Sequence, residues 1–212
     1  MKKVNSLVTN GNRELEKVLN DLYRNTSFPV GNVYFVVPSA HAGYVQFANY
    51  HNHKYEDSSD FLQTSISNAM SVSVASRYDK IYVAPGYTET VTAVKTLSKI
   101  GVSIIGLGEG NQRPLITPNG AIDVFNVTAA GVLLENLRFA SPSTDNQTAD
   151  INVAAAGVVI RNTEHIGSES GNNKVDMITV AAAGNDLLVE GVQAYNVTVD
   201  CATWLSLEGA AA

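Results

Sequence analysis

Two different patterns of apolar residues divide the chain near Tyr78. Before that point, apolar residues at helical spacing predict a short amphipathic helix over residues 13–23. Residues 33–37 are all aromatic or β-branched, which predicts a strand. Tyr, His, Asn and Gly are frequent over residues 39–58, and we expect that stretch to be irregular.

A second helix is predicted over residues 60–71. Asp60 and Gln63 have the spacing of a capping box, and Leu62 and Ile66 belong to an apolar stripe. Beyond this helix, short apolar runs closed by Pro or Gly predict strands instead.

The pattern after Tyr78 is a repeat with spacings of 26 and 27 residues. A corner of the form Val-X-Ala-Ala-Gly ends at Gly131, Gly157 and Gly184, and an apolar strand follows each one. The first two of these strands end at Asn136 and Asn162. A repeat of this length indicates a solenoid, in which each unit forms one coil.

One such unit cannot bury its own apolar face, so consecutive units must stack with parallel strands about 4.8 Å apart. We expect Val127, Val153 and Val180 to form one column, glycine to adopt positive φ at the corners, and the two asparagines to form a ladder. A Rossmann-like fold needs a helix between its strands, and the loop-like sequence over residues 141–146 leaves no room for one.

The predicted fold is therefore mainly β: a right-handed parallel β-helix with an N-terminal α-helical cap and a small N-terminal anchoring segment. We place the anchoring segment at residues 1–58, and the capping helix with the coils at residues 59–212. The last residues align with the corner of a further unit. This predicts either a piece of a longer β-helix or an end that a neighbouring subunit covers.

Charge and composition limit the classes of partner that the chain can bind. The net charge of −6 argues against nucleic acid, which needs clustered Lys and Arg. No run approaches the roughly 20 apolar residues of a membrane span. Cys201 is the only cysteine, and we interpret it as a buried structural thiol.

Candidate chemistry in the coils is sparse. Glycoside hydrolysis requires two carboxylates about 5–10 Å apart. Asp123, Asp150 and Asp176 occupy roughly equivalent corners and could form an acidic ladder, but we interpret them as solvated rim residues. His165 ends a coil strand, where a surface position is expected. We therefore predict no catalytic residue and no cofactor.

The N-terminal segment contains His41, His51 and His53 close to Glu56 and Asp57. No helix or cysteine fixes these side chains around a tetrahedral centre, so we predict no metal site. The same segment is rich in aromatic residues, which either pack beneath the capping helix or form a docking surface. They are Tyr34, Phe35, Tyr44, Phe47, Tyr50 and Tyr55.

Two stretches carry a family resemblance. Residues 60–69 (DFLQTSISNA) and 79–89 (DKIYVAPGYTE) resemble the opening of pectin-lyase-like β-helix proteins, and the likeness covers about 150 residues from Asp60 onward. In that superfamily a capping helix covers the N-terminal end of the solenoid. Residues 84–91 and 102–114 (VSIIGLGEGNQRP) are similar to β-helix proteins encoded among tailed-phage virion genes.

The phage resemblance implies a non-enzymatic structural component of a bacteriophage particle, such as a capsid decoration, head fibre or tail-associated protein. From this role and from the incomplete last unit, we expect the partners to be other copies of the chain, as a trimer, and other virion proteins. Charge and hydropathy argue against nucleic acid and a membrane. The resemblance implies the virion as the location, after synthesis in the host cytoplasm. The alternative is a tailspike-like protein that binds or cleaves a host surface glycan.

Overall fold

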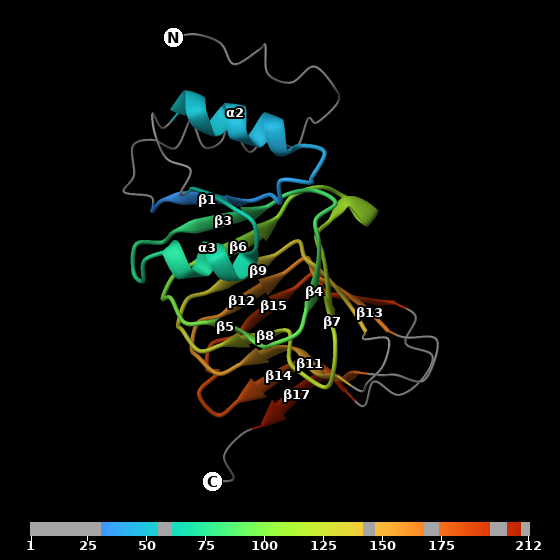
Figure 1. Cartoon of the computed structure of the whole chain (residues 1–212). Coiled ribbons are helices and arrows are strands. Elements are labelled where there is room, and N and C mark those ends of the chain that lie inside the picture. Colours follow the sequence, from blue (N-terminus) through green and yellow to red (C-terminus); the bar gives the residue numbers. More distant parts are fainter. Residues whose placement is uncertain (1–30, 55–60, 142–146, 168–173, 196–202, 209–212) are drawn as a thin grey trace.

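The computed structural model describes residues 31–54, 61–141, 147–167, 174–195 and 203–208. Within these residues three sheets of parallel strands form the sides of a β-solenoid, whose successive coils stack in about five turns (Figure 1). No described helix is long and apolar enough to span a bilayer. The predicted helix over residues 13–23 lies outside the described residues.

Each full coil contributes one strand to each sheet. The first sheet has the order β15-β12-β9-β6-β3-β1-β2, the second β16-β13-β10-β7-β4, and the third β17-β14-β11-β8-β5. The strands of the first sheet are β1 (Val33–Val36), β2 (Leu62–Gln63), β3 (Lys80–Val83), β6 (Ser103–Gly106), β9 (Leu133–Glu135), β12 (Val159–Arg161) and β15 (Leu188–Glu190). Those of the second are β4 (Thr88–Val91), β7 (Leu115–Pro118), β10 (Arg138–Ala140), β13 (Glu164–Ile166) and β16 (Gln193–Tyr195). Those of the third are β5 (Lys95–Leu97), β8 (Phe125–Val127), β11 (Gln147–Val153), β14 (Lys174–Ala181) and β17 (Thr203–Glu208).

The register confirms the predicted column of valines. Val153 pairs with Val127 on one side and with Val180 on the other, always in parallel. Leu97 and Leu207 continue the same column in β5 and β17. Because successive units lie directly over one another, inward side chains of all three sheets form one continuous core.

The N-terminal end of this core is closed by α3 (Ile66–Val72). Ile66, Ala69 and Met70 are buried among the inward residues of β1 and β3, so α3 is the capping helix that the sequence predicts. It begins later than predicted, because Ser65 is its N-cap and accepts a hydrogen bond from the backbone N–H of Asn68. Leu62 lies before the helix, in β2, where the chain pairs with β1.

A second helix, α2 (Tyr44–Lys54), occupies part of the stretch that we expected to be irregular, so that prediction is wrong. Helix α2 lies across β1 on the outside of the first sheet (Figure 1). Phe47 packs against Phe35 with ring centroids 5.4 Å apart. This tertiary contact, and not a periodic apolar stripe, holds the helix in place. Helices α2 and α3 thus cover β1 on both faces, which explains its uninterrupted apolar sequence.

The corners follow the predicted backbone conformation in two coils. Gly131 and Gly157 both have a φ of 67°. In the third corner the left-handed conformation falls on Asp186, with a φ of 56°, so the expectation of positive φ at Gly184 is wrong. Glycine is required at position 184 for space, since a Cβ there would lie 2.5 Å from the side chain of Val180.

Candidate functional site

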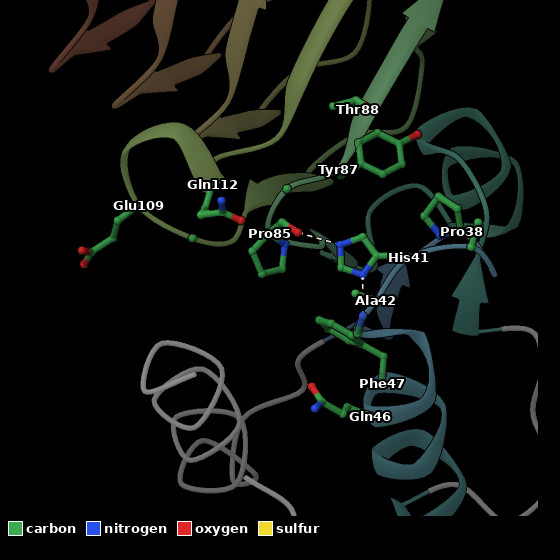
Figure 2. A pocket seen from close by; sticks show the side chains of 14 residues that line it. Pro38, His41, Ala42, Gln46, Phe47, Pro85, Tyr87, Thr88, Glu109 and Gln112 are labelled. Atoms are coloured by element: carbon green, nitrogen blue, oxygen red, sulfur yellow. Dashed lines mark hydrogen bonds between the residues drawn. The ribbon is translucent and has the colours of Figure 1, made fainter. Parts of the chain in front are cut away.

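A groove of about 1060 Å³ lies where the loop before α2 meets the turns after β3 and β6 (Figure 2). The groove combines apolar walls with a few polar groups. Its lining includes Pro38, His41, Gln46, Phe47, Pro85, Tyr87, Thr88, Glu109 and Gln112. It combines this volume with convergent polar side chains, and it is therefore the candidate site.

His41 is held firmly at the centre of the groove. Its Nδ1 accepts a hydrogen bond of 3.0 Å from the Gly43 backbone N–H. In a neutral imidazole the proton must then reside on Nε2, which lies 2.6 Å from the Pro85 carbonyl oxygen and donates to it. Figure 2 shows both bonds. His41 consequently ties the α2 loop to the β3 turn, and neither ring nitrogen remains available to a substrate.

Tyr87 forms a wall of the groove and does not serve as an acid. Its hydroxyl donates to Glu89 at 2.8 Å, and Lys95 binds the other oxygen of that carboxylate at 2.7 Å. Burial raises the pKa of Tyr87 well above its ordinary value, and the neighbouring Glu89 charge raises it further. The phenol therefore stays protonated throughout the physiological range.

Of the described residues lining the groove, Glu109 alone carries a carboxylate. Its side chain is exposed and points away from His41 in Figure 2. A glycosidase needs two carboxylates facing one another across the scissile bond. The groove can accept a polar ligand, but its described side chains do not form that acid pair.

A shallower depression of about 300 Å³ shares Gly108 and Glu109 with the groove. It follows the turns that end β9 and β12, where Asn136 and Asn162 adopt φ values of 57° and 52°. The Asn136 amide donates to the carbonyl oxygens of Gly106 and Gly108, both at 2.9 Å. These predicted ladder asparagines therefore occupy equivalent turns, with Gly191 (φ 64°) following them in the next coil.

A ladder of small polar residues runs along the third sheet. The Thr179 hydroxyl donates to the Asn152 side chain at 3.1 Å, and the Asn152 amide donates to Asn126 at 3.5 Å. We call this column the Thr/Asn ladder. Its members are Thr96, Asn126, Asn152, Thr179 and Ser206. Each is at least partly exposed, and none is charged.

The alternative of an acidic ladder is wrong, because its members do not align. The interpretation of the three aspartates as solvated rim residues is also wrong for Asp150, which lies in the core. The register pairs Asp176 with Ala149, and it also brings Asp123 beside Ala149. Asp150 is displaced by one residue and is fully buried. The reason is the unit length: the first two aspartates are 27 residues apart where the register step is 26, and the next two are 26 apart where the step is 27.

His165 is also fully buried, so its predicted surface position is wrong. The register places it directly over Phe139, in an inward column, with the two rings stacked at 5.2 Å. Its Nδ1 lies 2.6 Å from the Asp150 carboxylate, and Lys174 Nζ lies 2.5 Å from the same oxygen. No sequence pattern predicts this polar cluster, because its members come from three different strands.

The candidate docking surface is largely internal. Tyr34, Phe35 and Phe47 are each at most 3% exposed, so they pack the core and cannot dock a partner. Tyr44 is partly buried against Phe47 and its neighbours. The side chains of Tyr50, Tyr55, His51 and His53 lie outside the described residues, as do Glu56, Asp57 and Cys201. No metal-binding cluster of His, Cys, Asp or Glu occurs among the described residues.

The fold and its surface define a capped parallel β-solenoid with a polar ladder and a groove beside α2. No protein-family model, curated protein or solved structure matches the chain.

Proposed function

We propose that the chain is a non-enzymatic structural protein of a bacteriophage particle, acting through oligomeric assembly. The observation that carries this proposal is the Thr/Asn ladder. Its three central side chains, Asn126, Asn152 and Thr179, bind one another along the solenoid axis, and none of its members is charged. A neighbouring subunit can therefore cover the ladder itself without removing ions from water, which is the costly part of burying a polar surface.

The engagement of the charged residues supports a structural role. Glu164 is bound by Arg113 and Arg138, Asp150 by Lys174, and Asp79 by Arg77. Each of these carboxylates is at most 12% exposed and already has a cationic partner. Groups satisfied in this way hold coils together and are poorly placed to exchange protons with a substrate.

The alternative is a tailspike-like protein that binds or cleaves a glycan. The groove beside α2 favours this alternative by its size. Its two aromatic residues, Tyr87 and Phe47, are 3% and 2% exposed, so neither ring presents a platform for a sugar. The structural role is therefore the better supported of the two.

Mass spectrometry of purified phage particles from the source that encodes the chain tests the proposal. We expect the chain to co-purify with the major capsid protein at a fixed ratio through a density gradient. A chain present in the lysate but missing from the gradient-purified particles would overturn the proposal.

The assembly step has a separate test by light scattering coupled to size-exclusion chromatography. The chain should form an oligomer, with a trimer expected, and Asn152→Lys should weaken it by placing a charge on the Thr/Asn ladder. Thr90→Lys is the matched control, because Thr90 is exposed on the second sheet. A monomeric parent chain, or equal effects of both substitutions, contradicts assembly through the ladder.

A further inference from the structure

Polar side chains from the second and third sheets meet inside the solenoid, between the third and fourth coils. We call this group the core polar cluster. Its members are Gln147, Asp150, Thr163, His165 and Lys174. Each is at most 1% exposed, although Asp, Lys and His rarely occur at such depth without a partner.

Every contact of the titratable groups is satisfied when Asp150 is a carboxylate, Lys174 an ammonium and His165 a neutral imidazole with its proton on Nδ1. One oxygen of Asp150 accepts from His165 Nδ1 and Lys174 Nζ, and the other accepts from the Gln147 amide at 2.8 Å. His165 Nε2 is then free to accept from the Thr163 hydroxyl at 3.1 Å. The arrangement corresponds to a carboxylate, an ammonium and a neutral imidazole, with a net charge of zero.

A single additional proton destroys this balance wherever it binds. If Asp150 accepts the proton, Lys174 loses its counter-charge; if His165 accepts it, two cations face one carboxylate. Either event leaves one uncompensated positive charge in the interior, where such a charge costs several kcal/mol. Among the buried side chains that the structure describes, Gln147 Oε1 is the one polar atom without a hydrogen-bond partner.

Among the residues that the structure describes, no acid other than Asp150 contacts His165 or Lys174. Phe139 covers the His165 ring, and Phe125 meets Phe139 edge-on. The next carboxylates are already engaged: Glu164 by two arginines, and Asp123 by the Thr148 hydroxyl. Among the described residues, His165 and Lys174 are therefore the only charged or titratable groups in contact with Asp150.

We propose that the core polar cluster is an acid-sensitive lock that joins the second sheet to the third. At neutral pH it holds β11, β13 and β14 together through the interior. In acid strong enough to protonate the Asp150 carboxylate, the coils from Gln147 onward loosen. The coils built on β3 and β6 stay closed, since their strands pair outside the cluster. This inference is independent of the proposed particle role.

Hydrogen–deuterium exchange of the whole chain, followed by peptide from pH 7 to about 2 and corrected for intrinsic rates, tests the lock. The scan reaches this low pH because, although burial raises the pKa of Asp150, Lys174 and His165 outweigh burial and hold that pKa below its ordinary value. In acid, amide exchange in peptides covering β11 and β14 should become about tenfold or more faster. It should do so at a higher pH than in peptides covering β3 and β6. Asp150→Asn should loosen the same peptides already at neutral pH, since Lys174 is left unpaired.

The double variant Asp150→Asn with Lys174→Met keeps the cluster neutral without its titrating carboxylate. In this variant the peptides covering β11 and β14 should stay protected in acid until the whole chain unfolds. If the single variant does not fold, the double variant alone decides the test. Glu190→Gln, which removes an exposed ion pair with Arg161, is the matched control and should leave the acid response unchanged. Acid exchange that rises uniformly along the chain, or persists unaltered in the double variant, overturns the proposal.

Discussion

Arg113 and Glu164 are separated by 51 positions in the sequence, yet their side chains form an ion pair of 2.5 Å. The same Glu164 oxygen also accepts from Arg138 Nε at 3.0 Å. Arg113 follows the short helix η2 (Gly110–Gln112), whereas Arg138 and Glu164 lie in β10 and β13. One carboxylate therefore fastens a turn of an early coil to two later coils.

Removing the Glu164 charge should destabilise the solenoid. Glu164→Gln leaves two arginines, each no more than 14% exposed, without a counter-charge, and we expect a loss of about 2 kcal/mol in the free energy of unfolding. Urea unfolding at neutral pH measures it. Glu190→Gln should cost less than about 0.5 kcal/mol, because that pair is 39% and 60% exposed. Equal losses would contradict the fastening role.

Gly106 marks a place where the coils approach too closely for any side chain. A Cβ at this position would lie 2.1 Å from the Asn136 backbone oxygen, and backbone cannot move aside cheaply. Gly106→Ala should therefore lower the free energy of unfolding by several kcal/mol or prevent folding. Circular dichroism and thermal melting measure the effect. Gly131→Ala is the control: its Cβ has 3.8 Å of room, so only the strain of its positive φ, about 1 kcal/mol, is expected. A Gly106→Ala protein as stable as Gly131→Ala would show that the coils can separate locally.

The solenoid is predictable from the sequence because its determinants are local and repeated. The valine corners place Val127, Val153 and Val180 in one column without knowledge of distant contacts. Helix α2 cannot be predicted in this way. Among its described side chains only Phe47 is fully buried, and it packs on Phe35, twelve residues earlier in the chain. A single anchor leaves no periodic signal.

The interior chemistry escapes for a different reason. Asp150 looks like a surface residue because the register step of the third sheet changes from 26 to 27 residues at its coil, and an error of one residue in register changes which neighbour a side chain meets. The Asn136 turn, by contrast, is recognisable because Asn tolerates positive φ and recurs in the next unit. Repeats thus reveal the backbone, whereas the polar contacts depend on register.

The Asn136 turn provides a test that separates backbone strain from side-chain bonding. Asn136→Ala removes both amide hydrogen bonds and places an alanine, which rarely adopts positive φ, at a φ of 57°. We expect the free energy of unfolding to fall by about 3 kcal/mol. Asn136→Gly loses the same bonds but relieves the strain, so about 2 kcal/mol is expected. Chemical denaturation of both variants gives the difference. If the glycine variant matches the parent chain, the amide bonds to Gly106 and Gly108 contribute nothing.

Tyr87 predicts an alkaline limit to stability. Burial beside Glu89 raises its pKa in the folded protein, while the unfolded chain titrates near the ordinary tyrosine value of about 10. Above that value the unfolded state releases a proton that the folded state retains, so the stabilisation is complete below about pH 10 and declines as the pH rises further. Tyr87→Phe removes the ionisable group and the 2.8 Å bond to Glu89.

The variant should therefore be less stable by about 1 kcal/mol at neutral pH, yet lose less stability than the parent chain between about pH 9 and 11. Urea unfolding at each pH measures both effects. Tyr195→Phe serves as the control, because Tyr195 is 47% exposed and its hydroxyl bonds only to Gln193 among the described residues. If the parent chain and Tyr87→Phe respond identically to alkali, the Tyr87 phenol does not limit stability, and the wall of the groove is less enclosed than its 3% exposure indicates.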